Sequence, residues 1–68
     1  MYVLVRETKE IDGRIRRAFF EKVDWLFCSM VTDVRRAKKF RTKKEAVAEQ
    51  RRLGKMKEYF IGKEEDYT

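Results

Sequence analysis

One stretch decides the fold of this chain: Thr42-Lys43-Lys44-Glu45-Ala46-Val47-Ala48-Glu49-Gln50-Arg51-Arg52-Leu53-Gly54. It begins with a capping box, because a threonine followed three residues later by a glutamate satisfies free N–H groups at the start of a helix. Gly54 follows the helix-forming run and suits a C-terminal cap, where a left-handed backbone conformation is common. We therefore predict a helix over residues 43–53. Its inward face is expected to contain Ala46, Val47, Gln50 and Leu53.

Strand-forming segments precede this helix. Residues 2–8 and 14–22 are rich in β-branched and aromatic side chains and predict two strands. Asp12-Gly13 lies between them and predicts a type I′ hairpin turn. Residues 25–31 are apolar almost throughout, which indicates a third, central strand, with a buried helix as the alternative.

Shorter elements complete the prediction. Asp33 is expected to cap a short helical turn over residues 34–39, with Val34 and Ala37 facing inwards and Lys39 facing outwards. Residues 57–61 predict a last strand, which would end at Gly62.

The predicted fold class is α+β, with the element order ββ(β)ααβ. A small antiparallel sheet of three to four strands would be covered on one face by one main helix. A single domain is expected over residues 1–62, followed by an acidic, frayed C-terminal tail over residues 63–68.

The composition excludes several classes of function. The chain has 68 residues, one cysteine (Cys28) and no histidine. An internal disulfide is therefore excluded, as are His-dependent catalysis and the usual zinc site. A lone cysteine suits a reducing compartment, and no segment approaches the length of a membrane span. We expect a cytoplasmic protein that is not an enzyme and that uses no cofactor or metal.

Positive charge is concentrated in one segment. The net charge is +6, and residues 35–55 hold ten basic residues against two acidic ones, a balance of +8. Such a cluster attracts phosphates or acidic surfaces, although basic residues also coat solvated helix faces for solubility alone. The N-terminus of the predicted helix, at Thr42–Glu45, adds N–H groups that suit a phosphate. The predicted contact residues are Arg35, Arg36, Lys39, Arg41, Lys43, Lys44, Arg51 and Lys55, joined by Arg14, Arg16 and Arg17 of the second strand.

A familiar pattern, A-x-x-F-x-T-x-x-E-A, occurs in Ala37-Lys38-Lys39-Phe40-Arg41-Thr42-Lys43-Lys44-Glu45-Ala46. It resembles very small phage and mobile-element proteins, many of unknown function. Their usual order is a hairpin, a tryptophan-bearing strand, this motif, a short helix and a final strand, and Trp25 lies in the corresponding region. The resemblance implies the same fold and, for a phage-encoded chain, the cytoplasm of a host cell.

The part of this pattern from Phe40 to Ala46 also resembles the strand-to-helix junction in the arm-DNA-binding domain of phage tyrosine integrases. In that family a three-stranded sheet enters the major groove and a helix packs behind it. The resemblance implies groove contacts from Arg14, Arg16 and Arg17. It also implies that Arg41, Lys43 and Lys44 lie near phosphates.

Two functions compete for the basic segment. Nucleic-acid binding predicts an affinity that falls steeply with salt. The alternative is a protein-interaction module that docks on an acidic host protein and modulates it, using exposed aromatic side chains as anchors. Exposed Phe19, Phe20 and Tyr59 among the arginines favour protein contact or base stacking, whereas buried ones favour phosphate contact alone. A symmetric homodimer that covers an exposed sheet face is a third expectation.

Overall fold

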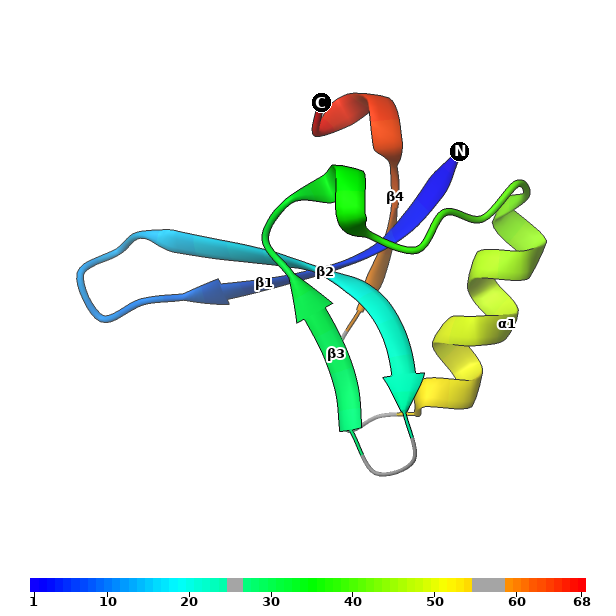
Figure 1. Cartoon of the computed structure of the whole chain (residues 1–68). Helices are drawn as coiled ribbons and strands as arrows, with labels where there is room; N and C mark the ends of the chain where they lie inside the picture. Colours follow the sequence, from blue (N-terminus) through cyan, green and yellow to red (C-terminus); the bar gives the residue numbers. More distant parts are fainter. Residues whose placement is uncertain (25–26, 55–58) are drawn as a thin grey trace.

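The computed structural model describes residues 1–24, 27–54 and 59–68. The protein has an α+β fold, in which one helix packs against a four-stranded antiparallel sheet (Figure 1). Within the described residues, no helix is long and apolar enough to cross a membrane. The elements are β1 (Tyr2–Lys9), β2 (Ile15–Asp24), β3 (Phe27–Val31), the 3-10 helix η1 (Val34–Arg36), α1 (Lys43–Leu53), β4 (Phe60–Lys63) and the 3-10 helix η2 (Glu64–Asp66).

The sheet has the order β3-β2-β1-β4, so β1 and β2 are its central strands. The third strand therefore lies at an edge, and its predicted central position is wrong. β2 continues to Asp24 with a register shift between Phe20 and Lys22, and it pairs with β3 along this extension. The apolar composition of residues 25–31 does not predict this edge position, because it does not show whether a strand has one neighbour in the sheet or two. Trp25 and Leu26 of the predicted strand lie outside the described residues.

The apolar run at the start of β1 serves two cores, because neighbouring strand residues point to opposite faces. Val3 and Val5 face a cluster formed with Phe19, Val34 and Ala37. Leu4 faces the other cluster, which contains Phe20, Phe40, Ala46 and Tyr59. The predicted helix covers the second cluster, whereas η1 and the C-terminal Tyr67 cover the first. Both faces of the sheet centre are therefore covered, rather than one.

Helix α1 begins and ends where its capping signals predict. The Thr42 hydroxyl accepts a hydrogen bond from the Glu45 N–H at 3.2 Å, and the Glu45 carboxylate accepts one from the Arg41 N–H at 3.3 Å. Gly54 has a φ of 73° and donates its N–H to the Arg51 carbonyl at 3.2 Å. Ala46 is fully buried, and the Gln50 amide donates to the Tyr59 carbonyl at 2.6 Å. Ala46, Gln50 and Leu53 of the expected inward face thus contact the rest of the fold, whereas Val47 is only half-buried and belongs to neither core cluster.

The predicted hairpin forms, but its turn lies one residue earlier than Asp12-Gly13. The Gly13 N–H donates to the Glu10 carbonyl at 3.0 Å, which makes Ile11 and Asp12 the central residues of the turn. Gly13 then adopts a φ of 88°, as is typical of a three-residue hairpin loop. The Glu10 N–H closes the loop by donating to the Arg14 carbonyl at 2.7 Å.

Residues 63–68, which the sequence predicts to be frayed, are held on the fold instead. β4 runs through Gly62 to Lys63, so this glycine does not end the strand. The Glu64 N–H then donates to the Met1 carbonyl at 2.9 Å, and η2 follows. The ring of Tyr67 meets Phe19 edge to face, with 5.2 Å between the ring centroids. The contact between Tyr67 and Phe19 thus holds residues 63–68 on the core, although the acidic composition of this segment predicts a solvated tail.

Candidate nucleic-acid interface

Four of the described cations of the basic segment are paired with carboxylates. Arg35 lies 3.1 Å from Asp33, which caps η1, and Arg36 lies 4.0 Å from Glu21. The Arg35 side chain and its backbone N–H both donate to Asp33, and these bonds hold the pKa of that carboxyl below its ordinary value. Arg52 lies 2.5 Å from Glu49. Each of these pairs has an exposed arginine and is therefore weak, but it reduces the positive field around that cation.

The fourth paired cation, Lys39, does not face outwards as predicted. The helical turn ends at Arg36, three residues earlier than expected, and the chain then turns so that the Lys39 side chain is only 21% exposed. Its ammonium donates to the carbonyls of Val34 and Ala37 and lies 3.3 Å from the Glu64 carboxylate. Lys39 therefore ties η1 to η2 and is removed from the candidate binding surface.

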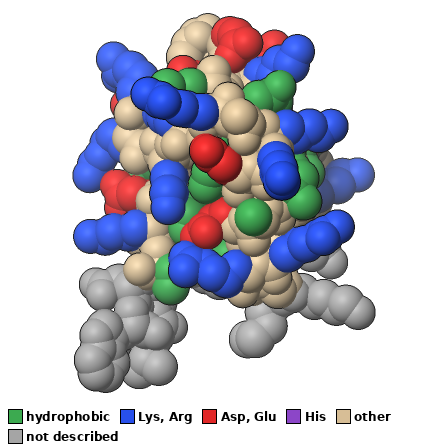
Figure 2. All heavy atoms as spheres, turned by 90° about the vertical axis from the view of Figure 1, so that its right-hand side faces the viewer, with side chains coloured by type: hydrophobic (Ala, Val, Ile, Leu, Met, Phe, Trp, Pro, Cys, Tyr) green, Lys and Arg blue, Asp and Glu red, His purple; other side chains and the backbone are tan. Residues whose placement is uncertain are grey.

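The remaining cations of this segment form what we call the α1 surface, whose described members are Lys38, Arg41, Lys43, Lys44 and Arg51. All five are exposed, and no described carboxylate lies within 4.0 Å of the charged side-chain nitrogens of any of them. Figure 2 shows Lys and Arg side chains spread over the face seen from the α1 side, around a smaller group of acidic side chains. Lys38, 5.5 Å from the Phe40 ring centroid, was not among the predicted contact residues. Lys55 lies outside the described residues.

The N-terminus of α1 is less suited to a phosphate than the sequence indicates. The Thr42 hydroxyl already accepts from the Glu45 N–H, and the Glu45 carboxylate lies beside the Arg41 N–H. A negative charge at this position opposes a phosphate and occupies donors that the phosphate would use. Any anion at the α1 surface would therefore be held by the side chains of that surface.

The three arginines expected on the second strand lie elsewhere: Arg14 directly precedes β2, which begins at Ile15, and Arg16 and Arg17 lie on β2. Arg14, Arg16 and Arg17 belong to the hairpin that projects from the sheet, and Figure 1 places this hairpin and α1 at opposite ends of the molecule. Each has a carboxylate neighbour: Asp12 at 3.4 Å from Arg14, Glu10 at 3.0 Å from Arg16, and Glu7 at 3.2 Å from Arg17. The structure therefore does not join them to the α1 surface in one site.

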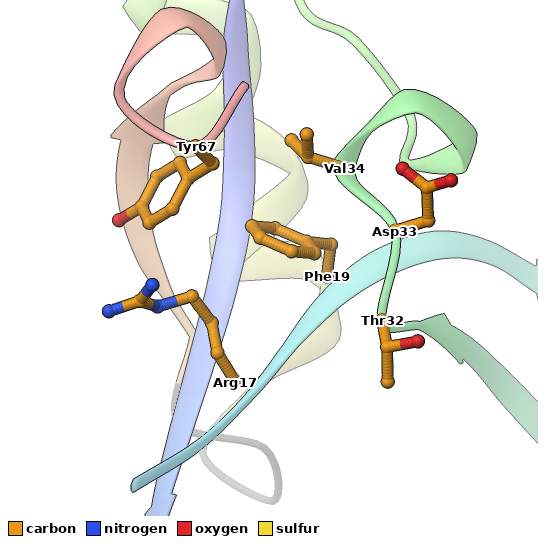
Figure 3. A pocket seen from close by; sticks show the side chains of 6 residues that line it. All are labelled: Arg17, Phe19, Thr32, Asp33, Val34 and Tyr67. Carbon is orange, nitrogen blue, oxygen red and sulfur yellow. The ribbon is translucent and has the colours of Figure 1, made fainter.

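A pocket of about 410 Å³ opens on the sheet face that carries η1 (Figure 3). Phe19 lies between Arg17 and Tyr67 on one side and Thr32 and Asp33 on the other. The Arg17 guanidinium lies 5.0 Å from the centroid of the Tyr67 ring. Both charged groups of the pocket are already paired, Arg17 with Glu7 and Asp33 with Arg35. The pocket thus offers a ligand an aromatic wall and no uncompensated charge.

Comparison of the chain with protein-family models, with curated proteins and with solved structures finds no match. The function must therefore be argued from the residues of the site.

Proposed function

We propose that this protein binds nucleic acid, without catalysing a reaction, through phosphate contacts made by the α1 surface. One observation carries the proposal: five exposed cations, Lys38, Arg41, Lys43, Lys44 and Arg51, have no described carboxylate within ion-pair distance. Cations that protein carboxylates leave uncompensated create a local positive potential, which attracts a polyanion and releases its bound counterions.

Burial of the aromatic side chains supports phosphate contact over base stacking. Phe19, Phe20 and Tyr59 are each at most 5% exposed, so none of them presents a ring face to a base or to a partner protein. Phe60 is 40% exposed but belongs to β4, and the five residues of the α1 surface include no aromatic side chain. A surface of this composition recognises the backbone of a nucleic acid rather than its bases. We therefore expect binding with little sequence preference.

The test is fluorescence anisotropy of short labelled DNA duplexes, single strands and RNA, with salt raised from about 50 to about 200 mM. If all five cations contact phosphates, the logarithm of the binding constant for duplex DNA should fall against the logarithm of salt with a slope of about −4.5. The triple variant Lys43→Ala/Lys44→Ala/Arg51→Ala should reduce the size of that slope by about 2.7.

A matched control removes the same charge from other places. Lys9, Lys22 and Lys63 are also exposed, and they lie on three different strands. The variant Lys9→Ala/Lys22→Ala/Lys63→Ala should keep most of the salt slope. Equal loss in both triple variants would mean that net charge alone drives binding, and absence of binding at low salt would overturn the proposal.

A further inference from the structure

The β1–β2 hairpin extends beyond the sheet as a free two-stranded ribbon. β4 pairs with β1 only from Tyr2 to Val5, and β3 pairs with β2 only from Phe19 onwards. Among the described residues, residues 6–18, which we call the hairpin arm, therefore pair only with each other, and no described strand lies along either edge of the arm. Figure 1 shows the arm projecting away from the remaining elements. A ribbon of this kind gains little stability from its own packing.

The tip of the arm exposes two isoleucines. Ile11 is 108% exposed and Ile15 is 62% exposed, the two largest values among the described large apolar side chains. Ile11 is also a central residue of the turn, where small polar residues or proline are usual. The fold gains no packing from this side chain. An exposed isoleucine in a turn is unfavourable for solubility and does not stabilise the fold, so we interpret Ile11 as a residue with a role in binding.

The charges of the arm differ from those of the α1 surface. Three of the four arginines of the arm, Arg14, Arg16 and Arg17, each lie within 3.4 Å of a carboxylate, that of Asp12, Glu10 and Glu7 respectively. The other two cations of the arm, Arg6 and Lys9, have no described carboxylate within ion-pair distance. Compensated cations attract phosphate weakly, whereas an apolar centre surrounded by charges of both signs matches the anatomy of a protein–protein interface. The two ends of the molecule therefore suit different classes of partner.

We propose that the hairpin arm docks into an apolar pocket of a partner protein, with Ile11 and Ile15 as the anchoring side chains. The paired charges form the polar rim, and the open edges of the ribbon can add main-chain hydrogen bonds to the partner. β-branched side chains lose little rotamer freedom on binding, which suits them as anchors. This surface is independent of the α1 surface, so the protein can join a nucleic acid to a second protein.

The experiment begins with a photo-reactive phenylalanine analogue at position 11 of the full chain, in cells that express it. The control carries the analogue at Ala48, an exposed residue of α1. A protein cross-linked only from position 11 is identified and purified. Its dissociation constant is then measured with the wild-type chain, with Ile11→Thr/Ile15→Thr, and with Val23→Thr, which alters an exposed valine outside the arm.

The proposal predicts that the double variant weakens binding of the purified protein by about a hundredfold, about tenfold for each isoleucine, and that Val23→Thr leaves binding unchanged. Circular dichroism and the salt-dependent DNA binding of the double variant should match those of the wild type, because threonine keeps the β-branch and position 11 is outside the core. Cross-links from position 11 to nucleic acid, to a second copy of the chain, or to the same proteins as from Ala48 would each overturn the proposal. The proposal would also be overturned if Ile11→Thr/Ile15→Thr bound the purified protein as tightly as the wild type does. Failure of DNA binding in the wild type would affect only the function proposed for the α1 surface.

Discussion

Tyr67 lies directly against Gly62, so that a Cβ atom on residue 62 would stand only 2.8 Å from Tyr67 Cε2. The same atom would lie 3.1 Å from a methyl group of Val5. We expect Gly62→Ala to lower the free energy of unfolding by about 1–2 kcal/mol, because the ring must leave its contact with Phe19 to make room. Urea unfolding followed by fluorescence or circular dichroism measures this change.

The matched control for this prediction is the same substitution without the tyrosine. In a Tyr67→Ala background, the cost of Gly62→Ala should fall, because only the 3.1 Å approach to the buried Val5 methyl group then opposes the new Cβ atom. An equal cost in both backgrounds would show that the ring does not set the requirement for glycine.

Replacing Lys39 by methionine should lower the free energy of unfolding by about 1–2 kcal/mol, because the carbonyls of Val34 and Ala37 lose a charged donor in a partly buried position. The neighbouring substitution Lys38→Met alters an exposed side chain and should change stability by no more than about 0.5 kcal/mol. Denaturant unfolding of the two variants in parallel tests the difference. Similar costs would mean that the tie between η1 and η2 contributes little.

Thr42→Ala should cost about 1 kcal/mol of stability, because the Glu45 N–H loses its hydrogen-bond acceptor at the start of α1. Thr42→Ser keeps the hydroxyl and should lower the free energy of unfolding by only about 0.3 kcal/mol. The comparison by thermal or urea unfolding isolates the cap from other effects of the position. A serine variant as unstable as the alanine variant would contradict the role of the hydroxyl.

Asp33 should make stability depend on pH in the acidic range. Hydrogen bonds from Arg35 lower the pKa of this carboxyl in the folded protein. Its contribution is therefore complete above the pKa of the unfolded chain, about 4, and is lost as the pH falls through the lower folded pKa. The melting temperature of the wild type should exceed that of Asp33→Asn at pH 7. This difference should disappear as the pH falls below about 4.

The titration of Asp33 can be followed directly by NMR of its side-chain carboxyl. Arg35→Met removes the guanidinium and should move the midpoint of that titration to higher pH, towards the ordinary value for aspartate. An unchanged midpoint would show that Arg35 does not hold the carboxyl in its charged form.

Features with local signals could be predicted from the sequence. The capping box at Thr42 and the glycine at position 54 define α1, because their partners lie within one helical turn. The β1–β2 hairpin follows from two strand-forming runs around Gly13. The edge position of β3 could not be found in this way, since it depends on how β1 and β2 pair with distant segments. The contact of Tyr67 with Gly62 also depends on where β4 places the end of the chain.

The candidate site was predictable to a similar extent. Composition locates the excess positive charge between residues 35 and 55, but it does not show which cations are compensated. Lys39 meets Glu64 and Arg36 meets Glu21 only after the chain has folded. The separation of the arm arginines from α1 is likewise a property of the tertiary arrangement.

The alternation of Val3, Leu4 and Val5 between two cores has a consequence for amide hydrogen exchange. Loss of either cluster exposes the strand that supports the other, so neither core can open by itself. Amides of Val3, Leu4 and Val5 should therefore exchange only through global unfolding and report the full stability of the protein. The arm lies beyond both clusters, and its amides should exchange through local opening at rates that do not change when the cores are stabilised.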